Sequence, residues 1–215
     1  MTVLWSNFPY LLQGAVVTLA LSVVCILLSN ILGFFLGAAS FLGPGWLRAP
    51  IAIYVFVFRG IPELVLMFLS YFGLAFIGFD IPAIVGVSAA LILYSAAYVT
   101  DYVRGALRTI DAGQVAAGRS LGLRWWQLFF RIELPQAFSL AIPSLINNAI
   151  ITIKATSYVS IVGVWELTYA SIEIVQRTLA AFQIFFGVML IYFIICYPLG
   201  ILARVLERRY KNILV

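Results

Sequence analysis

The chain has 215 residues, of which 64% are hydrophobic and only 10% are charged. No water-soluble fold of this size could bury so much apolar surface, so the composition excludes a soluble globular domain and makes the lipid bilayer the solvent. The formal charge of +5 does not indicate a nucleic-acid partner, because the orientation of a membrane protein explains an excess of Lys and Arg.

Five apolar stretches are each long enough to form a helix across about 30 Å of hydrocarbon, at a rise of about 1.5 Å per residue. They lie at residues 15–39, 50–77, 83–103, 137–161 and 180–203. These stretches are apolar on every side and lack the alternation of barrel strands, so helices are expected. We therefore predict an all-α membrane protein with five transmembrane helices in a single domain, residues 1–215, and a cytoplasmic loop at about 106–135.

The start of the chain lacks the charged segment and the cleavage site of a secretory signal, so we expect the first helix to remain in the mature protein. Basic residues near the ends of spans are retained on the cytoplasmic side of a membrane. This rule predicts an outer N-terminus and an inner C-terminus, with Arg177 alone on the outer side. The inner side then holds Arg48, Arg104, Arg108, Arg119, Arg124, Arg131, Arg204, Arg208, Arg209 and Lys211.

Charged and amide side chains inside a span are costly in lipid, so each one is a candidate functional residue. Arg59 and Glu63 are four residues apart in the second span and would share one helical face, while Pro62 between them favours a kink. Two alternatives are open. The two side chains neutralise each other, or they line a substrate path in which a free Glu63 carboxylate favours cationic substrates.

The fourth span carries Asn147, Asn148 and Lys154, which join Arg59 and Glu63 as substrate-path candidates. Adjacent residues point to different sides of a helix, so at most one of the two amides faces a central path and the other is expected to hydrogen-bond to a neighbouring helix. Lys154 lies further out. It either anchors the helix at the outer interface or meets a carboxylate from a substrate or a partner subunit.

Acidic residues mark two further positions. Glu166 and Glu173, in the outer connection between the last two spans, belong either to a solvated surface helix or to a docking site for a binding protein. Asp101 and Arg104 are three residues apart at the inner end of the third span, so we expect them to form a local ion pair.

Nothing in the sequence indicates catalysis within this chain. There is no nucleotide-binding loop of the G-x-x-x-x-G-K-[ST] type, no nucleophile elbow and no His. Cys25 and Cys196 fall inside apolar spans, where we expect two inert thiols and no metal site. The chain is therefore not expected to be an enzyme or to bind a cofactor itself.

The polar segment between the third and fourth spans, residues 109–135, is predicted to contain a short helix on the inner surface. Its small and weakly apolar residues would let the groove of another protein approach the backbone: Val115, Ala116, Ala117, Gly118, Leu121 and Gly122. An amphipathic segment held on anionic lipid by Arg and Trp side chains is the physical alternative.

The spacing in this segment resembles a known signature. Gly122, nine further residues and then Ile-Glu-Leu-Pro at 132–135 match the cytoplasmic motif of permease subunits of ATP-binding-cassette importers, written EAA, three residues, G, nine residues, I, any residue, LP. In that family the segment forms a coupling helix that enters a cleft of the ATPase subunit. Ala116 departs from the motif, which has glutamate there, so docking would depend on shape and on neighbouring residues. The resemblance implies an ATPase-coupling site at Gln114, Ala116, Ala117, Gly118, Arg119, Ser120, Leu121 and Gly122.

The resemblance covers nearly the whole chain. Residues 58–73, 146–167 and 206–210 look like the polar amino acid branch of these permeases. Arg-Gly-Ile-Pro-Glu at 59–63, the Asn147-Asn148 pair and Leu-Glu-Arg-Arg-Tyr at 206–210 most resemble the Q-type subunit of the histidine and lysine-arginine-ornithine importers and of their opine-importing relatives. Ala155 departs from the branch, in which many relatives carry Asp.

The resemblance implies a type I importer permease with a MetI-like fold in the bacterial inner membrane. It also implies two cytoplasmic ATPase subunits that hold ATP and Mg, a solute-binding protein outside, and a second permease chain that is either an M-type relative or another copy. The implied substrates are polar amino acids, with basic amino acids or opines first and glutamine or glutamate as the alternative. An ion-coupled secondary transporter or channel is the alternative function, although the sequence shows no inverted repeat.

Overall fold

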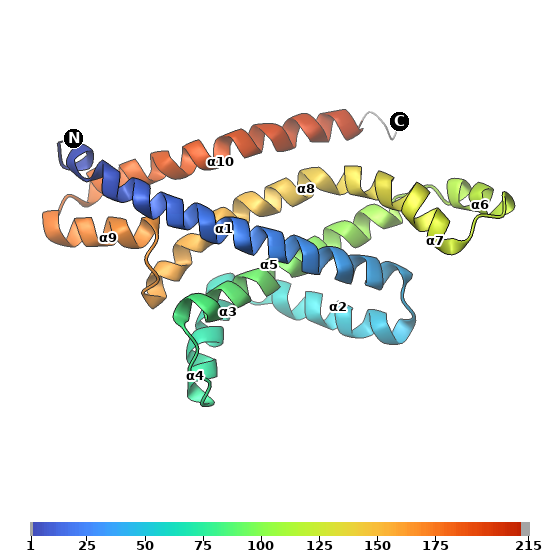
Figure 1. Ribbon diagram of the computed structural model, residues 1–215, viewed down its shortest axis with the longest axis horizontal. Helices are drawn as coiled ribbons and strands as arrows, with labels where there is room; N and C mark the ends of the chain where they lie inside the picture. The colour runs from blue at the N-terminus through green and yellow to red at the C-terminus, as the bar shows by residue number, and fades with distance from the viewer. Residues whose placement is uncertain (1, 212–215) are drawn as a thin grey trace.

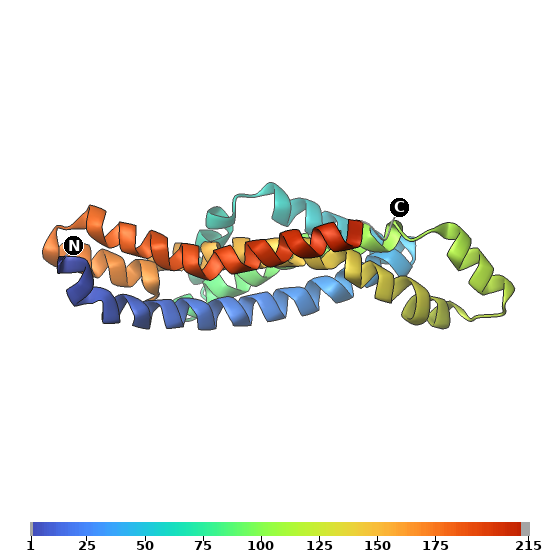
Figure 2. The same ribbon diagram turned by 90° about the horizontal axis from the view of Figure 1, so that it is seen from above.

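The computed structural model describes residues 2–211, and every regular element within this range is helical. Four long helices run along the long axis of the molecule (Figures 1 and 2). They are α1 (Thr2–Leu42), α5 (Ala83–Arg108), α8 (Leu134–Ala155) and α10 (Ala181–Lys211). Each is long and apolar enough to cross a membrane, α8 together with the helical turns that flank it. The predicted all-helical class is therefore confirmed.

The second predicted span is broken rather than continuous. α2 (Gly45–Gly60) ends before Pro62, and the chain goes on as α3 (Glu63–Phe68), a π-helical turn (Leu69–Gly73) and α4 (Leu74–Phe76). The two halves meet at 105°, because Pro62 has no N–H to donate and pushes Ile61 into an extended conformation, with φ −103° and ψ 137°. The described residues thus hold four candidate membrane helices, or five if the bent pair is one span.

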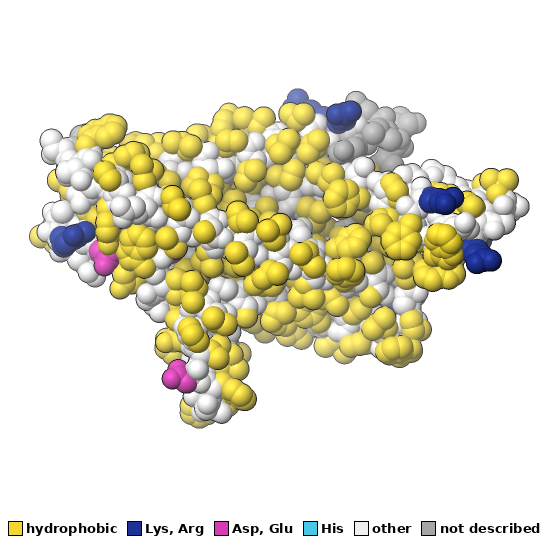
Figure 3. Space-filling model, in the orientation of Figure 1, with side chains coloured by type: hydrophobic (Ala, Val, Ile, Leu, Met, Phe, Trp, Pro, Cys, Tyr) yellow, Lys and Arg dark blue, Asp and Glu magenta, His cyan; other side chains and the backbone are white. Residues whose placement is uncertain are grey.

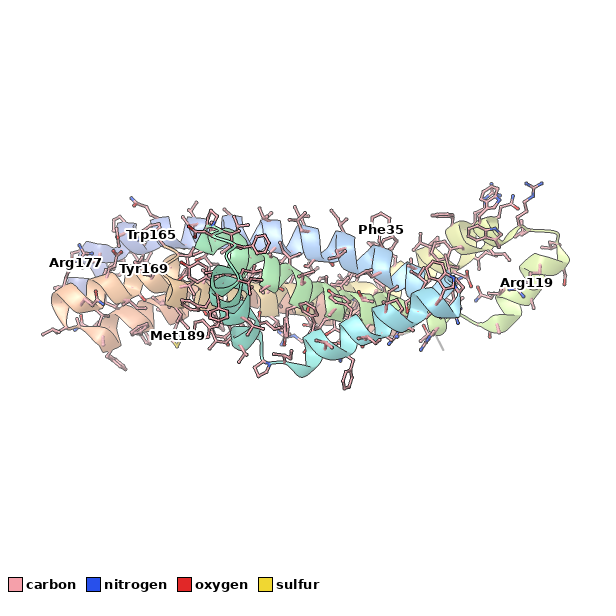
Figure 4. The ribbon with its side chains drawn as sticks, turned by 90° about the horizontal axis from the view of Figure 1, so that it is seen from below. Phe35, Arg119, Trp165, Tyr169, Arg177 and Met189 are labelled. Atoms are coloured by element: carbon pink, nitrogen blue, oxygen red, sulfur yellow. The ribbon has the colours of Figure 1, made fainter. Side chains whose placement is uncertain are left out.

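The molecule has two distinct ends. The N-terminal end of α1 and α9 (Leu167–Thr178) lie together at one end, whereas α6 (Ala112–Ser120) and α7 (Trp125–Leu128) project at the other (Figures 1 and 2). A π-helical turn (Phe129–Glu133) joins α7 to α8, and a 3-10 helix (Thr156–Val162) follows α8. The labelled side chains of Arg119 and Arg177 mark these opposite ends in Figure 4.

The observed helices extend past the predicted spans. α1 begins at Thr2 and not near residue 15, and α10 continues to Lys211 and not to residue 203. The predicted span at 137–161 corresponds to α8 and the 3-10 helix that follows it. Apolar length underestimates these helices, because polar and aromatic residues at a membrane interface continue a helix after its hydrophobic stretch has ended.

α1 and α5 approach each other closely through glycine. A Cβ atom on Gly33 would lie 2.5 Å from Cβ of Val99, and one on Gly37 would lie 2.8 Å from Cβ of Val103. Real Cβ atoms do not come this close to their neighbours, so any side chain here would push the two helices apart. These two glycines therefore support close packing within the chain, between its first and third predicted spans.

Apolar side chains cover much of the outer surface of the long helices (Figure 3). Trp5, Trp46 and Phe56 are among the large apolar residues that remain more than two-thirds exposed, at 70%, 76% and 81%. Such a surface is stable only in contact with lipid or with another membrane-embedded subunit.

Candidate functional site

The predicted inner-surface helix is present as α6, and local signals define both of its ends. Asp111 caps the start of α6, where its Oδ1 accepts hydrogen bonds from the N–H groups of Gly113 (2.5 Å) and Gln114 (3.2 Å). At the other end the N–H of Gly122 bonds to the carbonyl of Arg119 (2.9 Å) and the N–H of Leu123 to that of Gly118 (3.1 Å). This Schellman arrangement needs a left-handed residue, and Gly122 supplies it with φ +78°.

One face of α6 holds it against α7, the π-helical turn and the start of α8. A Cβ atom on Gly118 would lie 2.5 Å from Cδ2 of Leu128 and 3.2 Å from Cδ1 of Ile132, so this glycine is buried at the contact. Gln136 Nε2 donates to Gln114 Oε1 over 2.8 Å. Gly118 and Gln114, which the sequence places among the docking residues, therefore support α6 from inside the chain.

A second face of α6 is open to the surroundings. Ala117, Ser120 and Leu121 are exposed, Leu121 to 81%. Small side chains and one protruding leucine let a partner come close to the helix backbone and provide an apolar anchor. These three exposed residues form the outer face of α6.

A third face lines a hollow of about 520 Å³ between α6 and the ends of α1 and α5. Val115, Ala116 and Arg119 of α6 contribute to it, and Arg108 at the end of α5 and Glu133 border it. Arg108 and Arg119 are exposed, whereas Glu133 is half-buried. The predicted coupling residues therefore divide among three faces of one short helix.

A second candidate site lies where α2 meets α5. Asp101 pairs with Arg59 through Oδ2 and with Arg104 through Oδ1, and the Arg59 guanidinium carbon lies 4.8 Å from the centre of the Tyr98 ring. These residues line a hollow of about 460 Å³. The expected Asp101–Arg104 pair is confirmed, and Arg59 is added to it.

Of the two alternatives for Arg59 and Glu63, mutual neutralisation is wrong. The break at Ile61 and Pro62 separates them into different helices, so the spacing of four residues no longer places them on one face. Glu63 Oε1 is buried and has no hydrogen-bond partner among the described residues. No local pattern indicated Asp101 as the partner of Arg59, because the two are far apart in sequence.

The two adjacent amides of α8 differ, as the helical geometry predicts. Asn148 is buried and its Nδ2 donates to Ser95 Oγ of α5 over 2.8 Å, whereas Asn147 is exposed. Ser95 Oγ also donates to Ser29 Oγ of α1 over 3.1 Å, so Asn148 belongs to a polar contact among three helices. Asn147 and Lys154 are exposed on α8 together with Ile151 between them.

Glu166 does not lie on a docking surface, so the expectation for this residue is wrong. Its side chain is 0% exposed and caps α9. The carboxylate accepts hydrogen bonds from the Tyr169 N–H (2.9 Å) and the Thr18 hydroxyl (3.0 Å). Burial raises the pKa of Glu166, and these hydrogen bonds lower it only in part.

Glu173 is half-buried rather than free in solvent. Its Oε2 accepts hydrogen bonds from the Tyr10 hydroxyl (2.5 Å) and from Trp165 Nε1 (3.0 Å). Arg177 lies over the Tyr10 ring at 5.5 Å and is exposed. Trp165, Tyr169 and Arg177 thus gather at the α9 end of the molecule, as Figure 4 shows. This cluster ties α9 to the start of α1.

Residues 29–212 match the family model described as "Binding-protein-dependent transport system inner membrane component". The chain is 35% identical over 211 residues to the glutamine transport system permease protein GlnP of Escherichia coli (strain K12), covering 97% of this chain and 96% of that protein. It is 33% identical over 206 residues to the probable amino-acid ABC transporter permease protein YckA of Bacillus subtilis (strain 168), covering 96% and 91%. It is 32% identical over 213 residues to the octopine transport system permease protein OccM of Rhizobium radiobacter, covering 95% and 87%.

The fold is likewise similar to solved structures. A chain of an amino acid ABC transporter crystallised with histidines superimposes with a TM-score of 0.89 at 29% identity, over 96% of both chains. A chain of the MetNI methionine ABC transporter in an inward-facing conformation gives a TM-score of 0.78 at 19% identity, which shows the common fold alone. The chain therefore belongs to the inner membrane components of binding-protein-dependent transport systems, the permease subunits of ABC importers. It is a multi-pass protein of the inner membrane.

Proposed function

We propose that this chain is the membrane-spanning subunit of an ABC importer of polar amino acids and that α6 is its coupling helix. The observation that carries the proposal is α6 itself, which is capped at both ends, packs through Gly118 on Leu128 and Ile132, and exposes Ala117, Ser120 and Leu121 at one end of the molecule. ATP and Mg would be held by two ATPase subunits that grip this face. Hydrolysis there would drive the change between outward and inward access.

The proposed orientation places the N-terminus and α9 outside and α6 inside. Arg177 is at the α9 end, whereas Arg119 of α6 is at the opposite end, where Figure 3 also shows Lys and Arg side chains, as the retention of positive charge in the cytoplasm requires (Figures 3 and 4). The bent pair of α2 and α3–α4 would complete a fifth span. A solute-binding protein would then dock near α9, where Glu173 and Arg177 lie.

The substrate class is supported by the relatives, whose names refer to glutamine, octopine and amino acids, and by the structure crystallised with histidines. We place basic amino acids and opines first, with glutamine as the alternative. Asn147 and Lys154, which are exposed on α8, are the side chains left to line a path, because Asn148 and Arg59 have partners within the chain. Glu63 joins them, since its Oε1 has no hydrogen-bond partner among the described residues.

The test is coupled transport in proteoliposomes that contain the chain, its ATPase subunits and its second permease subunit. Loaded binding protein is expected to stimulate ATP hydrolysis and uptake, and Leu121→Asp on the outer face of α6 is expected to abolish both. Gly45→Asp, which adds the same charge where a side chain has open space, is the control. Full uptake by Leu121→Asp would refute the role of α6.

Competition by arginine, histidine, octopine and glutamine measures the substrate preference of the same complex. A preference for glutamine over the basic amino acids would refute the first substrate class and support the alternative. The mass of the intact complex shows whether the second permease subunit is another copy of this chain or an M-type chain. We propose an M-type chain.

A further inference from the structure

The hollow beside α6 has an unbalanced set of charges. It is bordered by Arg108 of α5, Arg119 of α6 and Glu133, and Phe41 and Leu107 supply apolar wall. Arg119 interacts electrostatically with Glu133. Arg108 has no hydrogen bond and no ion pair with any residue in the described range 2–211. Glu133 can neutralise only one of the two arginines, so the hollow carries a net charge of about +1.

The hollow and the outer face of α6 are adjacent surfaces of the same short helix. Val115, Ala116 and Arg119 line the hollow, and Ala117 and Ser120 follow directly on the outer face. A protein that grips the outer face thus brings its own side chains to the mouth of the hollow. Ala116 leaves the entrance open, because its methyl group fills little of the space.

We propose that an acidic side chain of the docked ATPase subunit enters this hollow and pairs with Arg108. The inference rests on the proposed function, because it needs an ATPase at α6. An arginine presents its donors in a planar fork that matches a carboxylate, and the apolar wall excludes water and strengthens the pair. In this contact between permease and ATPase, the acidic group is supplied by the ATPase subunit and not by α6.

The experiment measures the dissociation constant between the permease in lipid nanodiscs and the purified ATPase subunit, for the unchanged chain and for a set of charge variants. Arg108→Glu replaces the cation by a carboxylate that repels the acidic group of the ATPase. This variant is expected to weaken binding about 30-fold or more, as loss of an enclosed charge pair does. Arg108→Gln is expected to weaken it about tenfold. Arg204→Glu makes the same change of charge at an exposed position on α10, outside the hollow, and is expected to stay within about twofold.

Ala116→Glu is the decisive variant. A glutamate at this position fills the hollow from within and pairs with the arginines of its own chain, so it competes with the acidic group of the ATPase. We expect about tenfold weaker binding. Adding Arg108→Gln is expected to weaken binding little further, because both changes remove the same ion pair. Unchanged or tighter binding by Ala116→Glu would overturn the proposal.

The outcomes separate the inference from the proposed function. If Leu121→Asp abolishes ATPase binding while Arg108→Glu leaves it unchanged, α6 is the coupling helix and only the acidic contact is wrong. If neither change affects binding, the proposed function fails as well. If Arg108→Glu weakens binding only in nanodiscs that contain phosphatidylglycerol and not in purely zwitterionic ones, the hollow holds a lipid headgroup and the proposal is overturned.

Discussion

The folded structure and the local sequence pattern give Arg59 different ion-pair partners. Helical spacing predicts that Arg59 pairs with Glu63, whereas in the structure Arg59 pairs with Asp101 across two helices. The decisive perturbation is a pair of double-mutant cycles. One cycle combines Arg59→Gln with Asp101→Asn, and the other combines Arg59→Gln with Glu63→Gln.

The burial of the three side chains sets the expected size of the coupling. Asp101 is 20% exposed, Arg59 is 40% exposed and Arg104 is 25% exposed. Exposed ion pairs contribute about 0.2–1 kcal/mol, and breaking fully buried ones costs about 3–5 kcal/mol, so this half-buried pair is expected to couple by about 1–2 kcal/mol. Asp101→Asn also leaves Arg104 unpaired and is expected to cost about 2 kcal/mol, which lowers the melting temperature of a chain of this size by about 4–8 °C.

The buried cysteines supply the assay. Cys25 is 0% exposed and Cys196 is 8% exposed, so a thiol-reactive dye labels them only as the protein unfolds in detergent. The Arg59–Glu63 cycle is expected to couple by less than about 0.3 kcal/mol, since the two residues lie in separate helices. A coupling above about 1 kcal/mol in that cycle, or none in the Arg59–Asp101 cycle, would refute the reasoning.

Three further predictions use the same dye assay. Gly122→Ala is expected to destabilise the protein by about 1 kcal/mol, because it forces a side chain into the left-handed region of the backbone. Gly45→Ala is the control and is expected to have no effect, since a side chain there meets open space. Equal melting temperatures of the two variants would contradict this prediction. Asn148→Leu is expected to cost about 1 kcal/mol by removing the bond to Ser95, whereas Asn147→Leu leaves stability unchanged and lowers uptake. Glu166 has a raised pKa in the fold, so the folded state holds its proton more tightly, and stability is expected to fall as the pH rises above about 4.5. Glu166→Gln should flatten this slope, and an unchanged slope would show that another group causes it.

Features set by neighbouring residues in the chain could be predicted from the sequence. A short helix was expected in the polar segment that contains α6, and Asp111 before it and Gly122 after it are local signals for its two caps. The opposite exposure of Asn147 and Asn148 follows from the 100° turn per residue of any α-helix. Neither inference needed knowledge of which helices touch.

Features set by contacts between distant helices could not be predicted. Pro62 indicated a kink, but only packing decides that the chain turns by 105° and so parts Arg59 from Glu63. Glu166 looked like a surface residue because acidic side chains rarely lie inside a protein without partners. Its burial depends on Thr18, which lies 148 residues away in α1.

The joints on either side of α8 differ in how they respond to a force on α6. At the α6 joint, Gly118 packs directly on Leu128 and Ile132, so separating the two elements would open a void in close-packed structure. At the middle of the bundle, Asn148 holds Ser95 by a hydrogen bond between membrane-embedded side chains, and such bonds contribute only about 0.6 kcal/mol on average. The packed contact at α6 is therefore expected to resist separation more strongly than the hydrogen bond at the middle of the bundle. Loss of the Asn148 bond would still leave Ser95 with hydrogen-bond partners in Thr152 of α8 and Ser29 of α1, each 3.1 Å away.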